Sequence, residues 1–303
     1  MRTVSGSSLA GRVAIVTGAG RGLGRAHALV LAAEGASVIV NDLGGDLQGH
    51  GTDLTPAQDV VREITASGGR AAVSGHDVAD WQGAASLIDA AVKTFGDLHV
   101  LVNNAGILRD RTLANMGEDE WDAVIRVHLK GHAATTRHAM AWWRDRSKAG
   151  QPVAGSIVHT TSLAGLVGNF GQAAYASAKL GIVGLSRVAA LEGAKYGVRS
   201  NALSPSARTR IETSLKPPPE GVFDVFDPAN VSPLVAWLAR ADCPATNQVF
   251  QAYGNRVEVI GPSAIAVDVR TEGRWTVEAL DRALRDKLPK PPRLGDFVEG
   301  LNL

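Results

Sequence analysis

The chain has 303 residues, enough for one large domain or two small ones. Its 31 Lys and Arg residues balance 30 Asp and Glu residues, so charge gives no reason to expect nucleic acid or a membrane as a partner. A hydrophobic fraction of 45% excludes a disordered chain. Cys243 is the only cysteine, which excludes an intrachain disulfide and a cysteine-based zinc site, so we expect no metal.

Export and membrane signals are not evident in the sequence. Residues 1–10 lack the apolar segment of a secretory signal, and the longest apolar run, Ala28–Ala33, is far shorter than the roughly 20 residues of a membrane span. The low cysteine content suits a reducing compartment. We therefore predict a cytoplasmic protein that does not bind membranes.

Short β-branched runs alternate with segments of helical periodicity over the first two thirds of the chain. Thr55 and Gln58 match a capping box, and Asp80 is a predicted N-cap. The predicted strands cover residues 12–17, 37–41, 71–74, 98–102, 156–160 and 198–203, and the helices residues 24–34, 55–67, 80–95, 118–146 and 173–196. This alternation predicts an α/β fold with a doubly wound parallel sheet of the Rossmann type.

The pattern is less regular after residue 207. Residues 216–221 contain three consecutive prolines and predict a loop. A helix is expected over 227–240, followed by strands at 257–260 and 264–269 and a last helix at 276–288. We interpret residues 1–303 as one domain, with a core at 9–240 and a C-terminal extension at 241–303.

Glycines join the first strand to the first helix. Gly18, Gly22 and Gly24 allow positive φ and a close approach of the backbone to a pyrophosphate, although a tight turn without a ligand would also explain them. Asp42 ends the second strand, 24 residues after Gly18, where a carboxylate can accept both ribose hydroxyls and repel a 2′-phosphate. Asp42 favours NAD over NADP, whereas Arg21 favours the opposite choice more weakly.

Tyr175 and Lys179 are four residues apart in a predicted helix and share one face. An ammonium group near a phenol favours the phenolate, which suits proton transfer to or from an alcohol or carbonyl oxygen. Ser162, 13 residues before Tyr175, could bind the same substrate oxygen. Surface Tyr and Lys pairs with this spacing are common, so the pair alone is weak evidence.

Taken together, the glycine loop, residues 103–106, Ser162, Tyr175 and Lys179 resemble a classical short-chain dehydrogenase/reductase from Leu9 to about Pro205. The resemblance implies that Tyr175 is the catalytic acid/base, that Lys179 binds the nicotinamide ribose, and that Ser162 orients the substrate. It also implies that the cofactor, expected to be NAD, is bound by Gly18, Arg21, Gly22, Leu23, Gly24, Asp42, Leu43, Asp77, Val78, Asn104, Ala105, Gly106, Tyr175, Lys179 and Pro205.

A narrower resemblance rests on residues 40–46, 104–111 and 168–172. These segments are similar to the (3R)-hydroxyacyl-CoA dehydrogenase unit of peroxisomal multifunctional enzyme type 2. No hydratase or sterol-carrier segment follows, so a free-standing relative is expected. The resemblance implies an acyl-CoA-like substrate and fatty acid metabolism, with Leu163, Leu166, Val167 and Phe170 as candidates for lining an acyl groove or for ordinary core packing.

Two positions depart from the usual family pattern. His128 stands where the family has an asparagine that holds a proton-relay water, and it could act in catalysis or be a buried histidine bonded to the backbone. Ser204, Pro205 and Ser206 stand where the family usually has Pro-Gly near the nicotinamide, so the proline is kept at Pro205.

Three functions and an oligomeric state follow as hypotheses. The first is an NAD-dependent (3R)-hydroxyacyl-CoA dehydrogenase, the second an oxidoreductase for a 17β-hydroxysteroid or a 3-oxoacyl-carrier-protein, and the third a non-catalytic NAD-binding regulator. A homodimer or homotetramer is expected because two helices carry apolar residues on more than one face: Trp121, Val124, Trp142, Trp143, Ile182, Val183 and Leu185.

Overall fold

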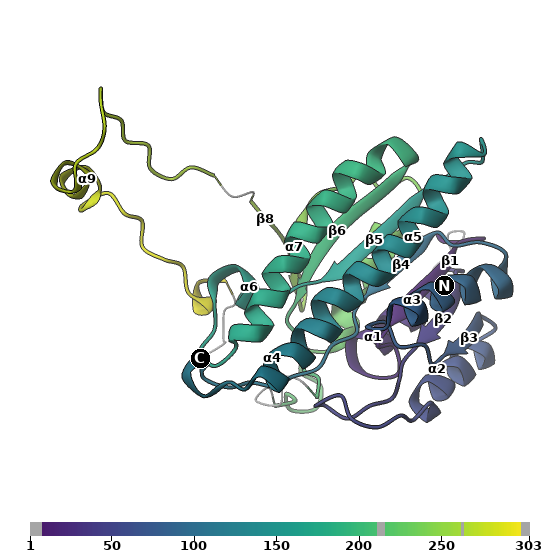
Figure 1. Ribbon diagram of the computed structural model, residues 1–303. Helices are drawn as coiled ribbons and strands as arrows, with labels where there is room; N and C mark the ends of the chain where they lie inside the picture. The colour runs from purple at the N-terminus through teal and green to yellow at the C-terminus, as the bar shows by residue number, and fades with distance from the viewer. Residues whose placement is uncertain (1–7, 211–215, 262–263, 298–303) are drawn as a thin grey trace.

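The computed structural model describes residues 8–210, 216–261 and 264–297. Its centre is an eight-stranded sheet in the order β3-β2-β1-β4-β5-β6-β7-β8, parallel except for the antiparallel pair β7 and β8 (Figure 1). The predicted doubly wound α/β fold is confirmed. The strands are β1 Val13–Thr17, β2 Ser37–Asn41, β3 Arg70–Ser74, β4 Val100–Asn103, β5 Gly155–Thr160, β6 Val198–Pro205, β7 Val249–Tyr253 and β8 Arg256–Ile260.

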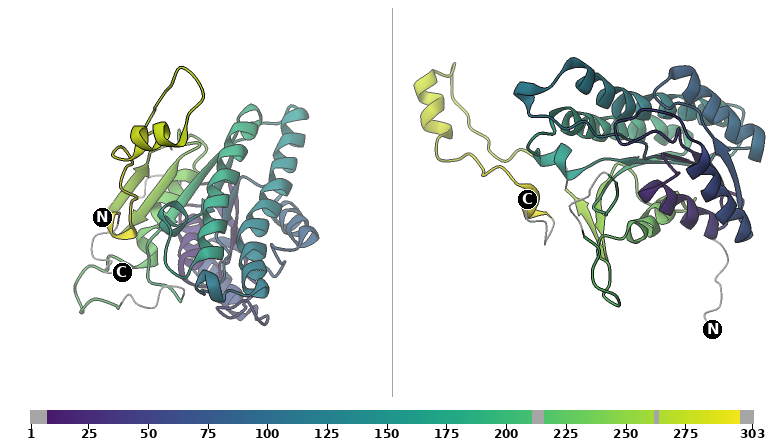
Figure 2. Two further views of the ribbon diagram at one scale, coloured as in Figure 1. Left: turned by 60° about the vertical axis from the view of Figure 1, so that its left-hand side comes forward. Right: turned by 90° about the horizontal axis from the view of Figure 1, so that it is seen from below.

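Helices cover both faces of the sheet (Figure 2). Helices α1, α2 and α8 pack on one face, and α3, α5 and α7 pack on the other. The helices are α1 Gly22–Ala33, α2 Thr55–Ala66, α3 Trp81–Phe95, α4 Glu118–Ile125, α5 Gly131–Lys148, α6 Leu163–Val167, α7 Ala173–Gly193, α8 Ser232–Ala239 and α9 Val277–Leu284.

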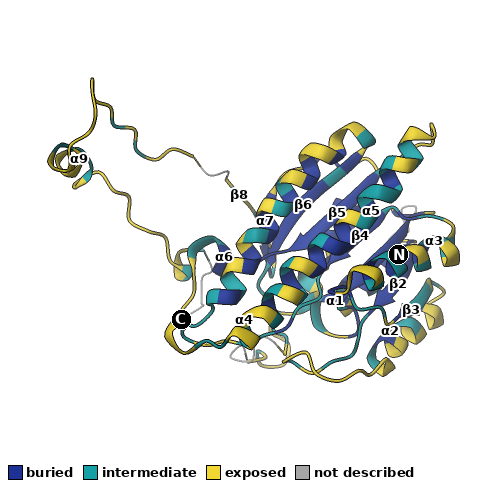
Figure 3. Cartoon of the chain, viewed as in Figure 1, coloured by how far each residue is buried: buried dark blue, intermediate teal, exposed yellow. Residues whose placement is uncertain are grey.

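The strand side chains alternate between two hydrophobic cores. Ala14 and Val16 of β1 belong to the core under α1, α2 and α8, whereas Val13 and Ile15 belong to the core under α3, α5 and α7. Every residue of β1 is buried, and the central strands lie between the helical layers (Figure 3). A two-sided apolar strand has this environment only inside a covered parallel sheet, which explains why these runs contain no polar alternation.

Of the two helix N-caps predicted from the sequence, one is confirmed and the other is wrong. Asp80 caps α3 as predicted, since Gly83 N donates to its Oδ2 at 2.6 Å. The capping box predicted at Thr55 is wrong, because Thr55 is already the first residue of α2. Asp53 takes that role in part: its Oδ1 accepts from Thr55 N at 2.9 Å.

The long helix predicted over residues 118–146 is divided by a π-helical turn at Arg126–Lys130. This turn widens the helix and carries His128. The helix α6 was not predicted.

The C-terminal third differs most from the prediction. Strand β7, which was not predicted, is wholly buried beside β6, so the sheet continues to Ile260, beyond the expected core boundary at residue 240. The strand expected at residues 264–269 does not form, because Ile265 is 87% exposed and has no sheet neighbour. Residues 264–297 form an arm that carries α9 away from the body (Figures 1 and 2) and then return Leu294 to the packing around Leu163.

Candidate active site

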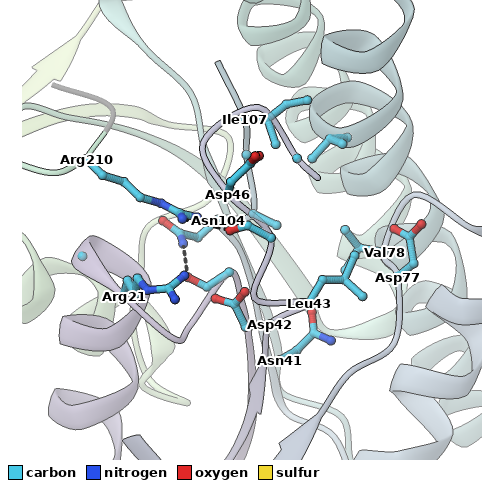
Figure 4. A pocket seen from close by; sticks show the side chains of 18 of the residues that line it. Arg21, Asn41, Asp42, Leu43, Asp46, Asp77, Val78, Asn104, Ile107 and Arg210 are labelled. Atoms are coloured by element: carbon cyan, nitrogen blue, oxygen red, sulfur yellow. Dashed lines mark hydrogen bonds between the residues drawn. The ribbon is translucent and has the colours of Figure 1, made fainter. Parts of the chain in front are cut away.

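Two adjoining pockets lie at the carboxyl ends of the parallel strands, the edge where such sheets bind ligands. The first, which we call the loop pocket, is formed mainly by the segments after β1, β2, β3 and β4 (Figure 4). The second, the tyrosine pocket, is formed by the segments after β5 and β6 together with α7. Both pockets include Leu23, Asn104, Gly106 and Thr209, so a ligand that fills one can reach the other.

The glycine loop is shaped by two close approaches. Gly18 has a φ of +63°, and a Cβ there would lie 2.8 Å from the Cα of Ala105. A Cβ on Gly24 would lie 2.1 Å from the carbonyl oxygen of Gly18. Asn104 fixes this arrangement, because its Nδ2 donates to the carbonyls of Thr17 at 3.0 Å and Gly18 at 3.2 Å. The loop therefore holds the N-terminus of α1 open toward the pocket, where free N–H groups suit a phosphate.

Asp42 connects the glycine loop with the loop that follows β2. Gly20 N donates to its Oδ2 and Gly44 N donates to its Oδ1, each at 2.7 Å. A carboxylate has about four lone-pair sites, so these two bonds leave acceptor capacity for ribose hydroxyls. The side chain lines the loop pocket in this fixed orientation.

Asp77 and Val78 form another wall of the loop pocket. The Asp77 carboxylate pairs with Arg126 at 2.5 Å. Val78 is buried and approaches Gly131 closely, since a Cβ there would lie 3.2 Å from a Val78 methyl group. The helix with the π turn is therefore joined to the pocket wall by packing and by an ion pair.

Lys179 is the buried amine of the tyrosine pocket. It is 2% exposed, and its Nζ donates to the Thr160 carbonyl oxygen at 2.7 Å. The same Nζ lies 5.4 Å from the ring centroid of Tyr175, one helical turn earlier on α7. Burial lowers the pKa of Lys179 to about 7.

Ser162 lies at the N-cap of α6 and lines the tyrosine pocket with Tyr175 and Lys179. Its Oγ accepts a hydrogen bond from Ala164 N at 3.2 Å and donates none to the residues that the structure describes, so the hydroxyl can donate to a ligand oxygen. Pro205, at the end of β6, lines the same pocket. Ser162, Tyr175 and Lys179, the residues expected to take part in proton transfer, therefore line one cavity.

His128 is buried beneath the tyrosine pocket. Its Nε2 lies 2.8 Å from the carbonyl oxygen and 3.1 Å from the amide nitrogen of Ile107, and its ring contacts Tyr175 edge to face. Burial lowers the pKa of His128 to about 3, so the ring is neutral at ordinary pH. Gly106 is required by this contact, because a Cβ there would lie 2.4 Å from the imidazole. The geometry favours the alternative of a buried histidine bonded to the backbone.

All residues predicted from the sequence for the site line one of the two pockets. Several lining residues were not predicted, including Thr209, Arg210 and Leu294. Thr209 and Arg210 follow β6 where the sequence has no regular pattern, and Leu294 comes from the distant arm without any local signal. Of the four candidates for an acyl groove, Leu163 alone lines the tyrosine pocket, and Phe170 is 89% exposed.

Residues 12–217 match the family model for short chain dehydrogenase. The chain belongs to the short-chain dehydrogenase family. Membership identifies it as an NAD(P)-dependent oxidoreductase acting on a CH–OH group. Within the parts of the chain that the structure describes, no helix could cross a membrane and no cluster of His, Cys, Asp and Glu could hold a metal ion.

This short-chain dehydrogenase is similar to proteins from bacteria and animals. It is 43% identical to hydroxyacyl-CoA dehydrogenase ChsB1 of Mycobacterium tuberculosis, over 94% of this chain and 91% of that protein. It is 44% identical to peroxisomal multifunctional enzyme type 2 of Mus musculus, over 80% of this chain and 31% of that much longer protein. A crystal structure of a short chain dehydrogenase from Mycobacterium avium, 50% identical, superposes with a TM-score of 0.85 over 94% of this chain and 98% of that one.

Proposed function

We propose that this short-chain dehydrogenase interconverts a (3R)-hydroxyacyl-CoA and its 3-oxo form with NAD as cofactor. The observation that carries the proposal is the placement of Tyr175, Ser162 and Lys179 in a pocket that adjoins the glycine loop. The acyl-CoA substrate is supported by the similarity to hydroxyacyl-CoA dehydrogenase ChsB1, 91% of which this chain covers.

In the proposed oxidation the carbinol carbon loses a hydride and its oxygen loses a proton. A bound NAD supplies the hydride acceptor. Tyr175, as phenolate, accepts the proton while the Ser162 hydroxyl donates a hydrogen bond to the same oxygen. Lys179 stabilises the phenolate, and its ammonium also suits the ribose hydroxyls of the cofactor. His128 positions Tyr175 by packing and holds the Ile107 backbone, and it transfers no proton in this proposal.

The substrate class can be tested by steady-state kinetics with a series of (3R)-hydroxyacyl-CoA thioesters of increasing chain length. Each additional buried methylene contributes up to about 0.8 kcal/mol to binding until the pocket is full, so kcat/KM is expected to rise with chain length and then level off. Matched (3S) thioesters, 17β-hydroxysteroids and 3-hydroxyacyl-carrier-protein are the comparison substrates. Higher efficiency with any of them would contradict the proposal, and no turnover with any of them despite NAD binding would favour the regulator.

Asp42 is expected to determine the preference for NAD over NADP. Replacing it with Ala removes the carboxylate that accepts the ribose hydroxyls and repels a 2′-phosphate, so the ratio of kcat/KM for NAD to that for NADP should fall by about tenfold or more. The measurement is cofactor kinetics at saturating substrate. Asp59→Ala, on the exposed side of α2, is the control and should leave the ratio unchanged. Wild-type protein that uses NADP equally well would contradict the assignment.

We also propose a homo-oligomer formed through α7. Val124, Trp143, Ile182 and Val183 are buried within the chain and are therefore not available as an interface. The outward stripe of α7 is instead formed by Leu180, Gly184, Val188 and Leu191, whose three larger side chains are 52%, 50% and 72% exposed.

Such an apolar helix face is typical of an interface between subunits. The wild type is expected to sediment as a dimer or tetramer at micromolar concentration, and Leu191→Glu should shift it toward the monomer. Val222→Glu, which changes an exposed apolar residue outside α7, is the control. A monomeric wild type would contradict the proposal.

A further inference from the structure

The carboxylates of the loop pocket already have partners. Asp42 accepts from the backbone at Gly20 and Gly44, and Asp77 pairs with Arg126. The third, Asp46, accepts from His50 N at 2.8 Å and lies 3.4 Å from the His50 ring nitrogen. Each of these three carboxylates therefore already has a partner and does not require a cation from a ligand. The two backbone hydrogen bonds of Asp42 and the ion pair of Asp77 also fix the orientation of those two side chains.

Two arginines that line the same pocket, unlike these carboxylates, have no ion-pair partner among the described residues. Arg21 and Arg210 enter the loop pocket from the same side (Figure 4). In the part of the chain that the structure describes, neither lies within ion-pair distance of a carboxylate, although hydrogen bonding and, to a smaller extent, the charge of Arg21 lower the pKa of Asp53. Arg21 precedes α1 directly. Arg210 follows β6, and its neighbour Thr209 approaches the first turn of α1, since a Cβ on Gly22 would lie 3.4 Å from a Thr209 methyl group.

Arg210 also contacts the loop at residues 44–53. Its Nη1 donates to the Gly45 carbonyl oxygen at 2.9 Å. Arginine carries five N–H donors, and Arg210 forms no other hydrogen bond within the described part of the chain, so several donors remain for a ligand. Arg210 can therefore hold this loop and bind an anion at the same time.

We propose that Arg210 binds the pyrophosphate of the dinucleotide, together with Arg21 and the N-terminus of α1, while it holds the loop at residues 44–53 over the pocket. This inference rests on the proposed NAD binding and adds a residue that the glycine motif does not contain. A planar guanidinium matches phosphate oxygens in a bidentate geometry, and the charges of Arg21 and Arg210 together compensate the two negative charges of a pyrophosphate.

The test compares ligands with and without a pyrophosphate. Equilibrium dissociation constants are measured for NADH, ADP-ribose and adenosine with the wild type and with Arg210→Gln. We expect the Kd of NADH and ADP-ribose to rise about tenfold in the variant, as the loss of charge-assisted hydrogen bonds implies, and the Kd of adenosine to stay within about twofold. The dependence of NADH binding on salt should also become weaker in the variant.

Two further variants complete the design. Arg111→Gln removes an equally charged side chain that pairs with Glu120 and lines neither pocket, and it should leave all three constants unchanged. Arg210→Lys keeps the charge without the planar fork and should give an intermediate Kd for ADP-ribose. Thermal unfolding without ligand shows whether each variant is folded, and Arg210→Lys carries the comparison if Arg210→Gln is not.

The outcomes separate this inference from the proposed function. Wild-type protein that binds neither NADH nor ADP-ribose would contradict the proposed function itself. Normal wild-type binding with an unchanged Kd of ADP-ribose in Arg210→Gln would overturn the inference alone. An equal loss of adenosine binding would also overturn it, because Arg210 would then act through the loop and the adenosine half of the cofactor rather than on the pyrophosphate.

Discussion

Tyr175→Phe is expected to lower kcat by at least about 10²-fold while leaving the Kd of NADH nearly unchanged. The substitution removes one hydroxyl group, the proposed proton acceptor, and general acid–base catalysis contributes about 10²–10⁴-fold. The aromatic ring remains, so its edge-to-face contact with His128 is preserved and the site should keep its shape. The measurements are kcat with a 3-hydroxyacyl-CoA and NADH binding by fluorescence.

Tyr196→Phe is the matched control for this variant. Tyr196 lies in the turn that follows α7 and packs with the core on the α3 side of the sheet. It does not line the tyrosine pocket. It should retain wild-type turnover. If Tyr175→Phe also retained it, the assignment of Tyr175 as the acid/base would be wrong.

Lys179→Met is expected to reduce both turnover and cofactor affinity. Two unit charges separated by 5.4 Å, the distance from Nζ to the Tyr175 ring centroid, interact by about 3 kcal/mol at an effective dielectric constant of about 20. Loss of that stabilisation of the phenolate corresponds to about 10²-fold in kcat. Methionine has a similar length without the charge, so packing changes little. A kcat decrease with an unchanged NADH Kd would contradict the second role of the ammonium.

The same variant tests the burial of the lysine through the pH dependence of stability. Because burial lowers the pKa of Lys179 from 10.5 to about 7, the unfolded chain binds more protons between these pH values. The free energy of unfolding of the cofactor-free protein therefore receives from Lys179 a contribution that rises with pH across this window. Lys179→Met should remove that contribution, whereas Lys195→Met, in the turn that follows α7, should leave it in place.

The regular part of the fold could be predicted because its signals are local. The wholly buried strands β1 and β2 each contain a run of at least three apolar residues, and the predicted strand at residues 37–41 coincides with β2. Strand β7 was missed because its five residues include Gln251, whose side chain is buried and donates to Ser206 Oγ at 2.9 Å. A buried polar residue that bonds to a distant partner gives no strand signal in the sequence.

The residues of the site could be predicted where they belong to a local sequence motif. They could not be predicted where only tertiary contacts bring them together. The Tyr175 and Lys179 spacing and the glycine loop are readable because helix and turn geometry fix their neighbours. The π turn around His128 has no such signal, since it depends on packing of the helix against Gly106 and Val78. Arg210 was likewise unreadable, because only the folded chain brings it beside the loop after β2.

The arm returns to Leu163 and contributes to the tyrosine pocket, although it belongs neither to the sheet nor to the two cores under the helices. The eight strands and both hydrophobic cores are complete before residue 261, yet Leu294 forms part of the tyrosine pocket. Substitutions in the arm can therefore change which substrates the tyrosine pocket accepts, while the two cores under the helices keep all of their residues. Such a chain can acquire new substrates by exchange of a segment that lies outside both of these cores, while the site around Tyr175 stays as it is.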